Sequence, residues 1–510
     1  MKLKLHKPTA LLAAAALLLT GCAGNAGASG EEESVIKWGV TALNGNWDPI
    51  VTGATGATIT MTPIYESLIT RGEDGKLTPA LAESWTYNKA GDAVTFTLRE
   101  GATFQDGSPV DAEAVKFFIE RAKTQENSAL KGSYNNIDTV EAVDATTFVV
   151  HLKEKDYQLP YLLSNRAGLV TSKVAAEADP EKLNTSLPVG AGPFKVVELI
   201  PEDKIVLEKF DGYWDAENIH IDRIEISGGN DASTLVPALQ SGVFNFASIG
   251  AGQEQQAEDA GLDVINDLNT NWVVTFLSLN LNKEPFNDPA VVDAVRYAID
   301  REELLQKGAL GIGEVANQPF PSGHITYNEE LESDFTYDPD KARALLEEAG
   351  YKAGDLKLKL YPFSSAQQAY AEIIQQQLGA VGIEVEIVVD PNWSAGYFGK
   401  EQAFSLYGYV GRDSHVQALT EHYDEGGVLN LSSPFTSDEF QKALTTIRET
   451  PTDSEDYAEN LQAASAAGYR NGSTIALVAT PNLWAKDPSV SDSTEKIEGR
   501  LGWKGVTITK

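Results

Sequence analysis

The chain has 510 residues, of which 42% are hydrophobic and 22% charged, and its 74 acidic residues outnumber 40 basic ones to give a net charge of −34. This composition is that of a globular protein, and the length exceeds what one hydrophobic core organises, so we expect two or more lobes. Phosphate backbones and acidic lipid headgroups repel such a polyanion, which argues against nucleic acid as a partner and against membrane binding through a basic patch.

The first 21 residues have the layout of a secretory signal peptide, with three lysines, an apolar run over residues 11–19 and then small residues. The run is shorter than the ~20 residues that cross a bilayer. Leu-Thr-Gly-Cys at 19–22 resembles the bacterial lipobox, which implies diacylation of the Cys22 sulfur and cleavage just before it. A disulfide is the alternative role for such a residue, but Cys22 is the only cysteine and has no partner in the chain.

Residues 22–34 are small, flexible and acidic, so they predict a disordered tether, and the folded body begins near Val35. Removal of the signal peptide takes away three lysines and no acids, which changes the net charge from −34 to −37. Acyl chains on Cys22 are then what holds the protein to a membrane. We expect it at the cell membrane, lipid-anchored on the extracytoplasmic face, either outside the cytoplasmic membrane or in the periplasm.

The first half of the body contains antiparallel patterns. Apolar residues alternate with polar ones over residues 94–98, which predicts a half-buried strand. A turn is predicted at Asp106-Gly107, and a helix follows with Asp111 as its N-cap. Residues 140–154 and 194–210 each have the pattern of two antiparallel strands.

The second half follows a different order. A helix is predicted from its N-cap Asp338 to a stop at Gly350. A strand at 356–360, a helix over 366–382 and a strand over 383–389 then form a βαβ unit, whose strands we expect to be parallel with a right-handed crossover. The chain is therefore of the α/β class, with two lobes of different make-up.

No catalytic constellation is found. The sequence contains no G-x-S-x-G elbow, no G-x-x-x-x-G-K-[ST] phosphate loop, no H-E-x-x-H and no second cysteine. Among the six histidines only His415 and His422 are close, and seven residues of helix amount to ~10.5 Å of rise, too far for both imidazoles to reach one metal. We therefore expect no catalytic residue, no metal site and no cofactor.

Six stretches of the body together resemble the family 5 extracellular solute-binding proteins of ABC importers, which include oligopeptide, dipeptide, nickel and opine receptors. In chain order they are LTPALAESWTYNKAGDAVTFTLREGATFQDGSPVDAEAVKFFIERA, VGAGPFKVVEL, FDGYWDAENIHIDRIEI, LSLNLNKEPFNDPAVVDAVRYAIDREEL, YDPDKARALLEEAGY and AVGIEVEIVV. The resemblance covers residues 36–510. Asn245 is a departure, because relatives usually carry an aspartate there.

This resemblance implies a type II periplasmic-binding-protein-like fold of the α/β class, in which two lobes are joined by a hinge and the first lobe is enlarged by an inserted subdomain. On this basis we divide the body into three parts. They are lobe 1 (residues 35–60, 190–270 and 475–510), the inserted subdomain of lobe 1 (61–189) and lobe 2 (271–474).

The resemblance also implies a function. A protein of this kind is a monomer that captures a small peptide or peptide-like solute by hinge closure and delivers it to an ABC permease in the membrane. ATP is hydrolysed on another subunit. Two alternatives stay open: the same scaffold could bind a nickel or other metal-chelate or an opine, or it could serve as an extracellular hydrolase or sensor.

Candidate ligand contacts lie in loops that carry aromatic side chains and fixed donors. Asn44, Trp47 and Thr52 follow the first strand, in the region where the resemblance implies ligand contacts in dipeptide receptors. Trp47 is equally compatible with a place in the core, because tryptophan is highly buried on average. Trp272 stands at the entrance to the second lobe.

The segment over residues 406–419 contains Tyr409, Arg412, Asp413 and His415. It aligns with the segment in which peptide receptors place the acid that pairs with the α-amino group of the ligand. That acid aligns nearer Gly411, so its assignment to Asp413 requires a shift of two residues.

The same segment supports the metal-chelate alternative. The resemblance implies an Asp-Pro-His sequence at this point in nickel receptors. Asp413-Ser414-His415 keeps the acid and the imidazole of that sequence. One imidazole can ligate a metal already held by a chelator, and an arginine such as Arg166 can pair with the carboxylates of that chelator. The competing interpretations are that His415 is a solvated loop residue or a helix cap and that Arg166 pairs with a nearby acid.

Overall fold

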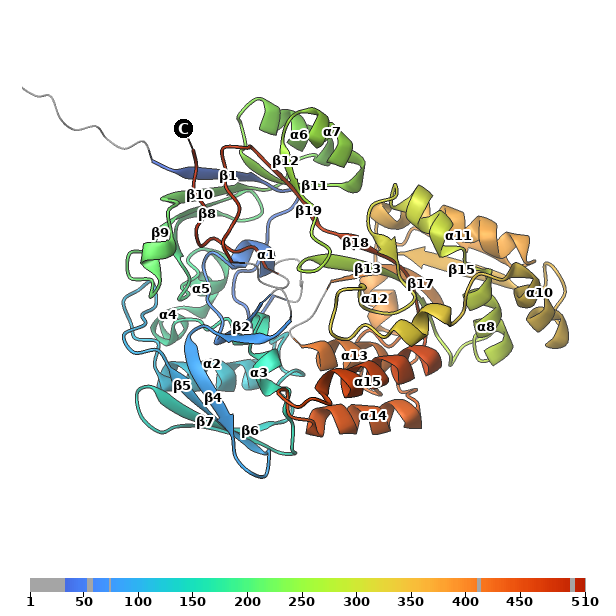
Figure 1. Ribbon diagram of the computed structural model, residues 1–510, viewed down its shortest axis with the longest axis horizontal. Helices are drawn as coiled ribbons and strands as arrows, with labels where there is room; N and C mark the ends of the chain where they lie inside the picture. The colour runs from blue at the N-terminus through green and yellow to red at the C-terminus, as the bar shows by residue number, and fades with distance from the viewer. Residues whose placement is uncertain (1–32, 53–57, 73–74, 411–413, 496–499, 510) are drawn as a thin grey trace, which may run out of the picture. The chain divides into compact units, whose positions relative to one another are not determined.

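Two large β-sheets organise the chain from Ser34 onward in the computed structural model of the protein (Figure 1). The structure describes residues 33–52, 58–72, 75–410, 414–495 and 500–509. The predicted signal peptide, Cys22 and most of the tether lie outside these residues. Within the described ranges, no helix has both the length and the apolar character that a bilayer crossing requires.

The seven-stranded sheet has the order β12-β19-β11-β1-β10-β9-β8. Strand β1 pairs in parallel with β10 and β11, and the other pairs are antiparallel. Its apolar face buries Ile36 and Trp38 together with Ile224 and Ile226, which alternate with polar residues along the strands. The strands are β1 (Val35–Gly39), β8 (Phe194–Ile200), β9 (Lys204–Lys209), β10 (Arg223–Ser227), β11 (Phe246–Ile249), β12 (Asp263–Ile265) and β19 (Leu483–Lys486). Three helices belong with this sheet: α1 (Thr58–Met61), α6 (Ala232–Gln240) and α7 (Glu254–Asp259).

A smaller antiparallel sheet of order β4-β5-β7-β6 lies between β1 and β8 in the sequence. Its core includes the stacked rings of Phe96 and Phe148, 4.8 Å apart, and the buried face of α2. Its strands are β4 (Ala82–Tyr87), β5 (Ala93–Leu98), β6 (Ile137–Ala142) and β7 (Thr147–Leu152). The same stretch of chain contains the β2 (Ile69–Arg71) and β3 (Leu77–Pro79) pair and the helices α2 (Ala112–Thr124), α3 (Leu159–Leu162), α4 (Lys173–Ala178) and α5 (Pro180–Thr185). Below, the first lobe denotes this stretch together with the seven-stranded sheet and its helices.

The six-stranded sheet has the order β14-β18-β13-β17-β15-β16 and, with the helices α8 to α15, is called the second lobe below. Alternate residues of its central strands enter different cores: Phe276 and Tyr407 face one, Leu277 and Leu406 the other. The strands are β13 (Trp272–Leu279), β14 (Glu314–Val315), β15 (Lys357–Pro362), β16 (Glu384–Ile387), β17 (Phe404–Val410) and β18 (Thr474–Pro481). The helices are α8 (Pro289–Ala298), α9 (Arg301–Glu303), α10 (Pro339–Glu348), α11 (Gln368–Ala380), α12 (Trp393–Phe398), α13 (His415–Tyr423), α14 (Asp438–Glu449) and α15 (Tyr457–Asn471).

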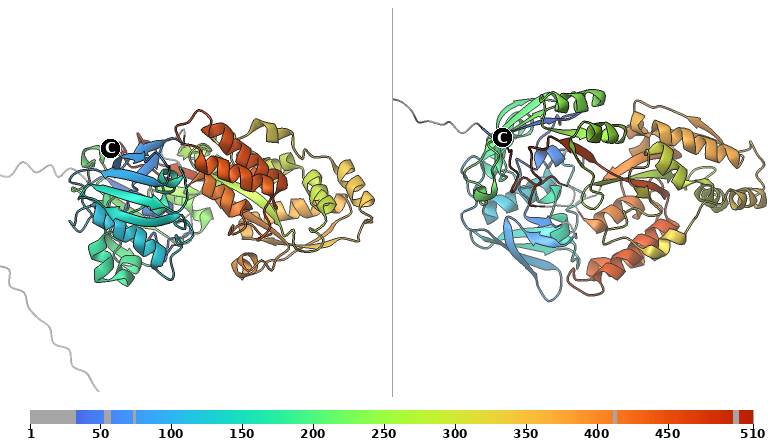
Figure 2. Two further views of the ribbon diagram at one scale, coloured as in Figure 1. Left: turned by 90° about the horizontal axis from the view of Figure 1, so that it is seen from below. Right: turned by 45° about the horizontal axis from the view of Figure 1, so that its top comes forward.

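Helices α13, α14 and α15 lie together in all views (Figures 1 and 2). The core that they form with the six-stranded sheet also takes in Tyr161 from the first lobe, whose ring stacks on Tyr457 at 5.8 Å. The two lobes therefore share a buried contact. The chain passes between the large sheets twice, from β12 to β13 and from β18 to β19. Strand β18 pairs with β13, so sheet membership places the second crossing at Asn482, seven residues after the predicted boundary at 475.

Several predicted elements are confirmed. Asp111 caps α2, accepting a hydrogen bond from the Ala114 amide at 2.8 Å, and Asp338 caps α10. Gly350 follows α10 with a φ of +89°, a conformation that glycine adopts without steric cost. Strands β15 and β16 are parallel, as the βαβ pattern predicts, and β6–β7 and β8–β9 are antiparallel. The α/β class is thereby confirmed.

Candidate functional site

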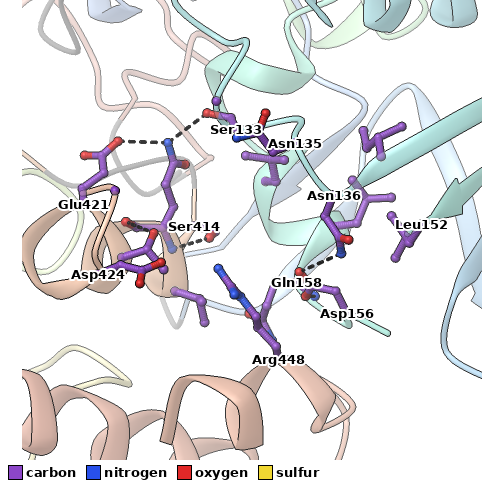
Figure 3. A pocket seen from close by; sticks show the side chains of 18 of the residues that line it. Ser133, Asn135, Asn136, Leu152, Asp156, Gln158, Ser414, Glu421, Asp424 and Arg448 are labelled. Carbon is purple, nitrogen blue, oxygen red and sulfur yellow. Dashed lines mark hydrogen bonds between the residues drawn. The ribbon is translucent and has the colours of Figure 1, made fainter. Parts of the chain in front are cut away.

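A cavity of about 660 Å³ lies between the two lobes (Figure 3). The first lobe contributes residues from the α2–β6 connection, the end of β7 and the α3 region. The second lobe contributes α13, the loop after it and the end of α14. The volume falls in the range of roughly 300 to 1,000 Å³ that is usual for small-molecule sites.

The walls of the cavity carry charges of both signs. The acidic side chains are Glu154, Asp156, Glu421 and Asp424, and the basic ones are Lys153, Lys155, Arg166 and Arg448. Amides of Asn135, Asn136, Gln158 and Gln417 lie among them. Such a lining can satisfy a polar ligand that itself carries both an acidic and a basic group.

Arg166 and Thr52, two of the predicted contacts, are brought together at this cavity. Arg166 stands in a short 3₁₀ turn after α3, lines the cavity and is nearly buried. Its Nη1 donates a hydrogen bond of 2.7 Å to the main-chain oxygen of Thr52, which is also buried. This bond ties the loop after β1 to the cavity wall.

Asn44 and Trp47 are placed elsewhere and do not line the cavity. The Asn44 side chain donates to the Thr60 hydroxyl at 3.1 Å. Trp47 is only 1% exposed and belongs to the core beside the seven-stranded sheet, and its carbonyl accepts a hydrogen bond from the Tyr65 hydroxyl at 2.8 Å. The structure therefore gives Trp47 a place in the core, and contact with a ligand stays a prediction for both residues.

A cluster of rings contains the predicted residues Trp272, Tyr409 and His415, none of which lines the cavity. The Trp272 ring is 6.3 Å from that of Tyr409 and 5.9 Å from that of His324. His324 in turn lies 4.7 Å from His415, and Tyr161 of the first lobe packs on His415 at 4.9 Å. All of these distances join ring centroids. Because Tyr161 belongs to the first lobe, the cluster links both lobes.

His415 itself is buried, with 2% of its surface exposed, and it is the first residue of α13. The N-cap is Ser414, whose hydroxyl accepts a hydrogen bond from the Gln417 amide at 2.9 Å. His415 is therefore neither the solvated loop residue nor the cap that sequence reasoning considered. Its neighbours Ser414 and Val416 both line the cavity. Arg412 and Asp413 lie outside the described residues, so their predicted roles stay predictions.

One glutamine of the first lobe bridges to the second. The Gln158 Nε2 donates to the main-chain oxygen of Ile447 at 3.2 Å, and its Oε1 accepts from the Tyr457 hydroxyl at 3.0 Å. We call this pair of bonds the Gln158 bridge. Both side chains are buried, and burial, with Tyr161 adding to it, raises the pKa of the Tyr457 hydroxyl well above its usual value. Tyr457 therefore stays protonated and remains a donor at neutral pH.

Further contacts across the cavity support the bridge. The Tyr157 amide donates to the Arg448 carbonyl at 2.8 Å, and the Gln417 side chain donates to the Ser133 hydroxyl at 3.2 Å. Burial raises the pKa of the nearby Asp156 carboxyl, and hydrogen bonding and the Arg448 guanidinium oppose that rise. Tyr157, Gln158 and Gln417 stand in no motif that the sequence reveals, because each contacts a partner far away in the chain.

The family model of the bacterial extracellular solute-binding proteins, family 5, matches residues 76–428. The chain belongs to this family. Its relatives include the glutathione-binding protein GsiB of Salmonella paratyphi A, 31% identical over 356 residues, and GsiB of Escherichia coli K12, 30% identical over 353 residues. Each alignment covers 68% of this chain and 68% of the relative.

Solved structures of the same fold bind different solutes. DppA of Helicobacter pylori, an ABC transporter-associated periplasmic binding protein in complex with the peptide STSA, matches with a TM-score of 0.80 at 22% identity, and the match covers 94% of this chain and 98% of that one. AgaA from A. tumefaciens R10, in complex with agropinic acid, matches with a TM-score of 0.79 at 24% identity, and the match covers 93% of this chain and 99% of that one. NikZ of Campylobacter jejuni, in complex with Ni(L-His), matches with a TM-score of 0.78 at 19% identity, and the match covers 92% of this chain and 98% of that one. At these identities the likeness shows the fold alone.

Family membership decides between the functional classes left open by the sequence. This family 5 protein is the substrate-binding component of an ABC importer, and it is a binding protein, not an enzyme.

Proposed function

We propose that the protein captures a peptide-like solute in the cavity between its lobes and delivers it to an ABC permease. The observation that carries this proposal is the position of the cavity, which has charged side chains from both lobes in its walls. A solute that contacts both lobes stabilises the closed form because those contacts exist only when the lobes are together. The GsiB and DppA relatives, described as binding glutathione and a peptide, support a peptide-like solute.

Within this proposal, Arg166 and Thr52 contribute polar contacts at the first-lobe wall. The rings of Trp272, Tyr409 and His415 belong to one cluster, and the neighbours of His415, Ser414 and Val416, are part of the opposite wall. Because an arginine holds a carboxylate through two parallel hydrogen bonds, Arg166 is suited to an acidic group of the solute.

The protein over residues 23–510, purified without chelator, allows a direct test. Native mass spectrometry followed by denaturing release should yield peptide masses, and calorimetric titration of glutathione and of di- to tetrapeptides should identify a ligand. Arg166→Ala should weaken that binding at least tenfold. Arg343→Ala is the matched control, because Arg343 is exposed on α10 and pairs with Asp340. Equal affinity of the Arg166→Ala variant and the control would contradict the proposed site.

A second candidate function is favoured by one observation, the contact between the His324 and His415 rings at 4.7 Å. Two adjacent imidazoles can complete the coordination of a metal that a small chelator already holds. In that case the purified protein would contain nickel, cobalt or iron, and His415→Ala would remove the metal without unfolding the chain. Metal-free protein that still binds peptides would reject this candidate.

We further propose that Cys22 carries the lipid that tethers the protein to the extracytoplasmic face of a membrane. The lipobox-like sequence before Cys22 and the membership of an importer-associated family support this. The predicted lobe boundaries are proposed with one adjustment, a second crossing at Asn482, because β18 pairs with β13.

A further inference from the structure

Arg448 stands apart among the four basic side chains of the cavity. Lys153 donates to the Asn135 carbonyl at 2.7 Å, Lys155 lies 3.7 Å from Glu449, and Arg166 donates to Thr52. The Arg448 guanidinium makes no hydrogen bond or ion pair of this kind with any part of the chain that the structure describes. Its donors therefore remain available to a ligand.

The Arg448 guanidinium is directed into the cavity (Figure 3). Arg448 lies in the last turn of α14, is half-buried and extends towards the middle of the cavity (Figure 3). Its own carbonyl accepts the Tyr157 amide of the first lobe, and the preceding carbonyl accepts from Gln158. The end of α14 is thus fixed by the opposite lobe when the lobes are together.

The acidic side chains around Arg448 are engaged by neutral donors. Asp424 accepts a hydrogen bond from Gln441 at 2.6 Å, and Glu421 accepts one from Gln417 at 3.1 Å. Asp156 accepts from the Gln158 amide at 2.8 Å and is the carboxylate that Arg448 influences electrostatically. No acid among the described residues forms a two-pronged pair with the guanidinium, which is the arrangement that an arginine favours.

We propose that Arg448 binds a carboxylate of the solute from the second-lobe side, so that the transported class consists of solutes with a free carboxylate. This inference rests on the proposed function, because it places the solute in the same cavity. Because Arg448 belongs to the second lobe, a solute whose carboxylate it binds favours the closed form when the rest of that solute contacts the first-lobe wall.

The test pairs each di- to tetrapeptide with its C-terminal amide and titrates both into the wild-type protein, Arg448→Gln, Arg448→Lys and the control Lys442→Gln. Lys442 is exposed on the same helix and does not line the cavity, so its substitution removes one positive charge without touching the site. We expect the free acid to bind the wild type and the control at least tenfold more tightly than the amide. In Arg448→Gln this preference should vanish, and in Arg448→Lys it should be reduced, because lysine keeps the charge and loses the bidentate geometry.

The outcomes separate the inference from the proposed function. If acid and amide bind the wild type equally, or if Arg448→Gln weakens both to the same extent, the carboxylate role of Arg448 is overturned and the peptide receptor stands. If no peptide binds the wild type, the proposed solute class is wrong and the inference falls with it. The melting temperatures of the variants, compared with the wild type, show whether Arg448→Gln has folded, and Arg448→Lys gives the same comparison with the charge retained.

Discussion

The Gln158 bridge offers a way to shift the balance between open and closed forms without touching the solute. Gln158→Ala removes both bonds of the bridge, the one to the Ile447 carbonyl and the one from the Tyr457 hydroxyl. Each buried hydrogen bond of this kind contributes about 1 kcal/mol net, so the closed form should lose about 2 kcal/mol relative to the open form. That loss corresponds to a roughly thirtyfold change in an equilibrium constant.

The consequence is measurable as affinity. Where the solute-free protein is mostly open, closure is part of binding, and the dissociation constant of the solute rises by the factor that closure loses. Calorimetric titration of the peptide ligand should therefore show a dissociation constant that is raised roughly thirtyfold in Gln158→Ala. Small-angle X-ray scattering should show that more ligand is needed to reach the compact form.

Gln402 supplies a matched control. Its side chain is also buried and also makes one bond to a carbonyl, that of Trp393 at 3.2 Å, and one with a hydroxyl, that of Ser405 at 2.6 Å. Both partners belong to the second lobe, so Gln402→Ala should lower the melting temperature and leave the affinity unchanged. A folded Gln158→Ala protein with wild-type affinity would refute the reasoning that the bridge favours closure.

Three further predictions concern other parts of the chain. Asn245→Asp should lower the free energy of unfolding, measured by chemical denaturation, by about 1 to 3 kcal/mol. The reason is that the Asn245 Nδ2 donates to the Val35 carbonyl at 2.8 Å, and a carboxylate would face that carbonyl without a donor. An unchanged free energy of unfolding would contradict this. Burial raises the pKa of the half-buried Glu66 carboxyl, and the Arg500 guanidinium opposes that rise. The folded state therefore holds the proton of Glu66 more tightly than the unfolded state does. The free energy of unfolding falls as the pH rises from the pKa of the unfolded state, about 4.3, through the raised pKa of the folded state. The melting temperature of Glu66→Gln relative to the wild type should therefore increase between pH 4 and pH 7, and a difference independent of pH would refute it. Cys22→Ser should release the protein from the membrane fraction of its host and abolish the mass of the attached lipid, whereas retention in that fraction would show another anchor.

Local hydrogen bonding explains what could be predicted from sequence. Asp111 and Asp338 cap their helices by bonds to amides three residues away, and such bonds depend only on neighbouring residues. The parallel pair β15 and β16 follows from the length of the helix between two apolar strands. The same reasoning could not separate a core role for Trp47 from a binding role, because both bury a large ring.

Long-range partners explain what could not be predicted. Gln158 and Tyr457 are 299 residues apart, and no pattern near either residue indicates the other. The contact between the His324 and His415 rings has no signal in the sequence either, because the two histidines are far apart in the chain and belong to different segments. Arg448 occupies the last turn of an ordinary amphipathic helix, where a positive charge is favoured by the helix dipole, so its orientation into a cavity has no signal of its own.

Hydrogen–deuterium exchange of the protein with and without its tightest-binding peptide would show whether a solute is held between the lobes at this cavity. We expect a bound peptide to slow exchange in segments of both lobes, over residues 129–137 and 153–166 in the first lobe and 414–428 in the second. Slower exchange confined to one lobe, or absent from these segments while the peptide is demonstrably bound, would contradict it.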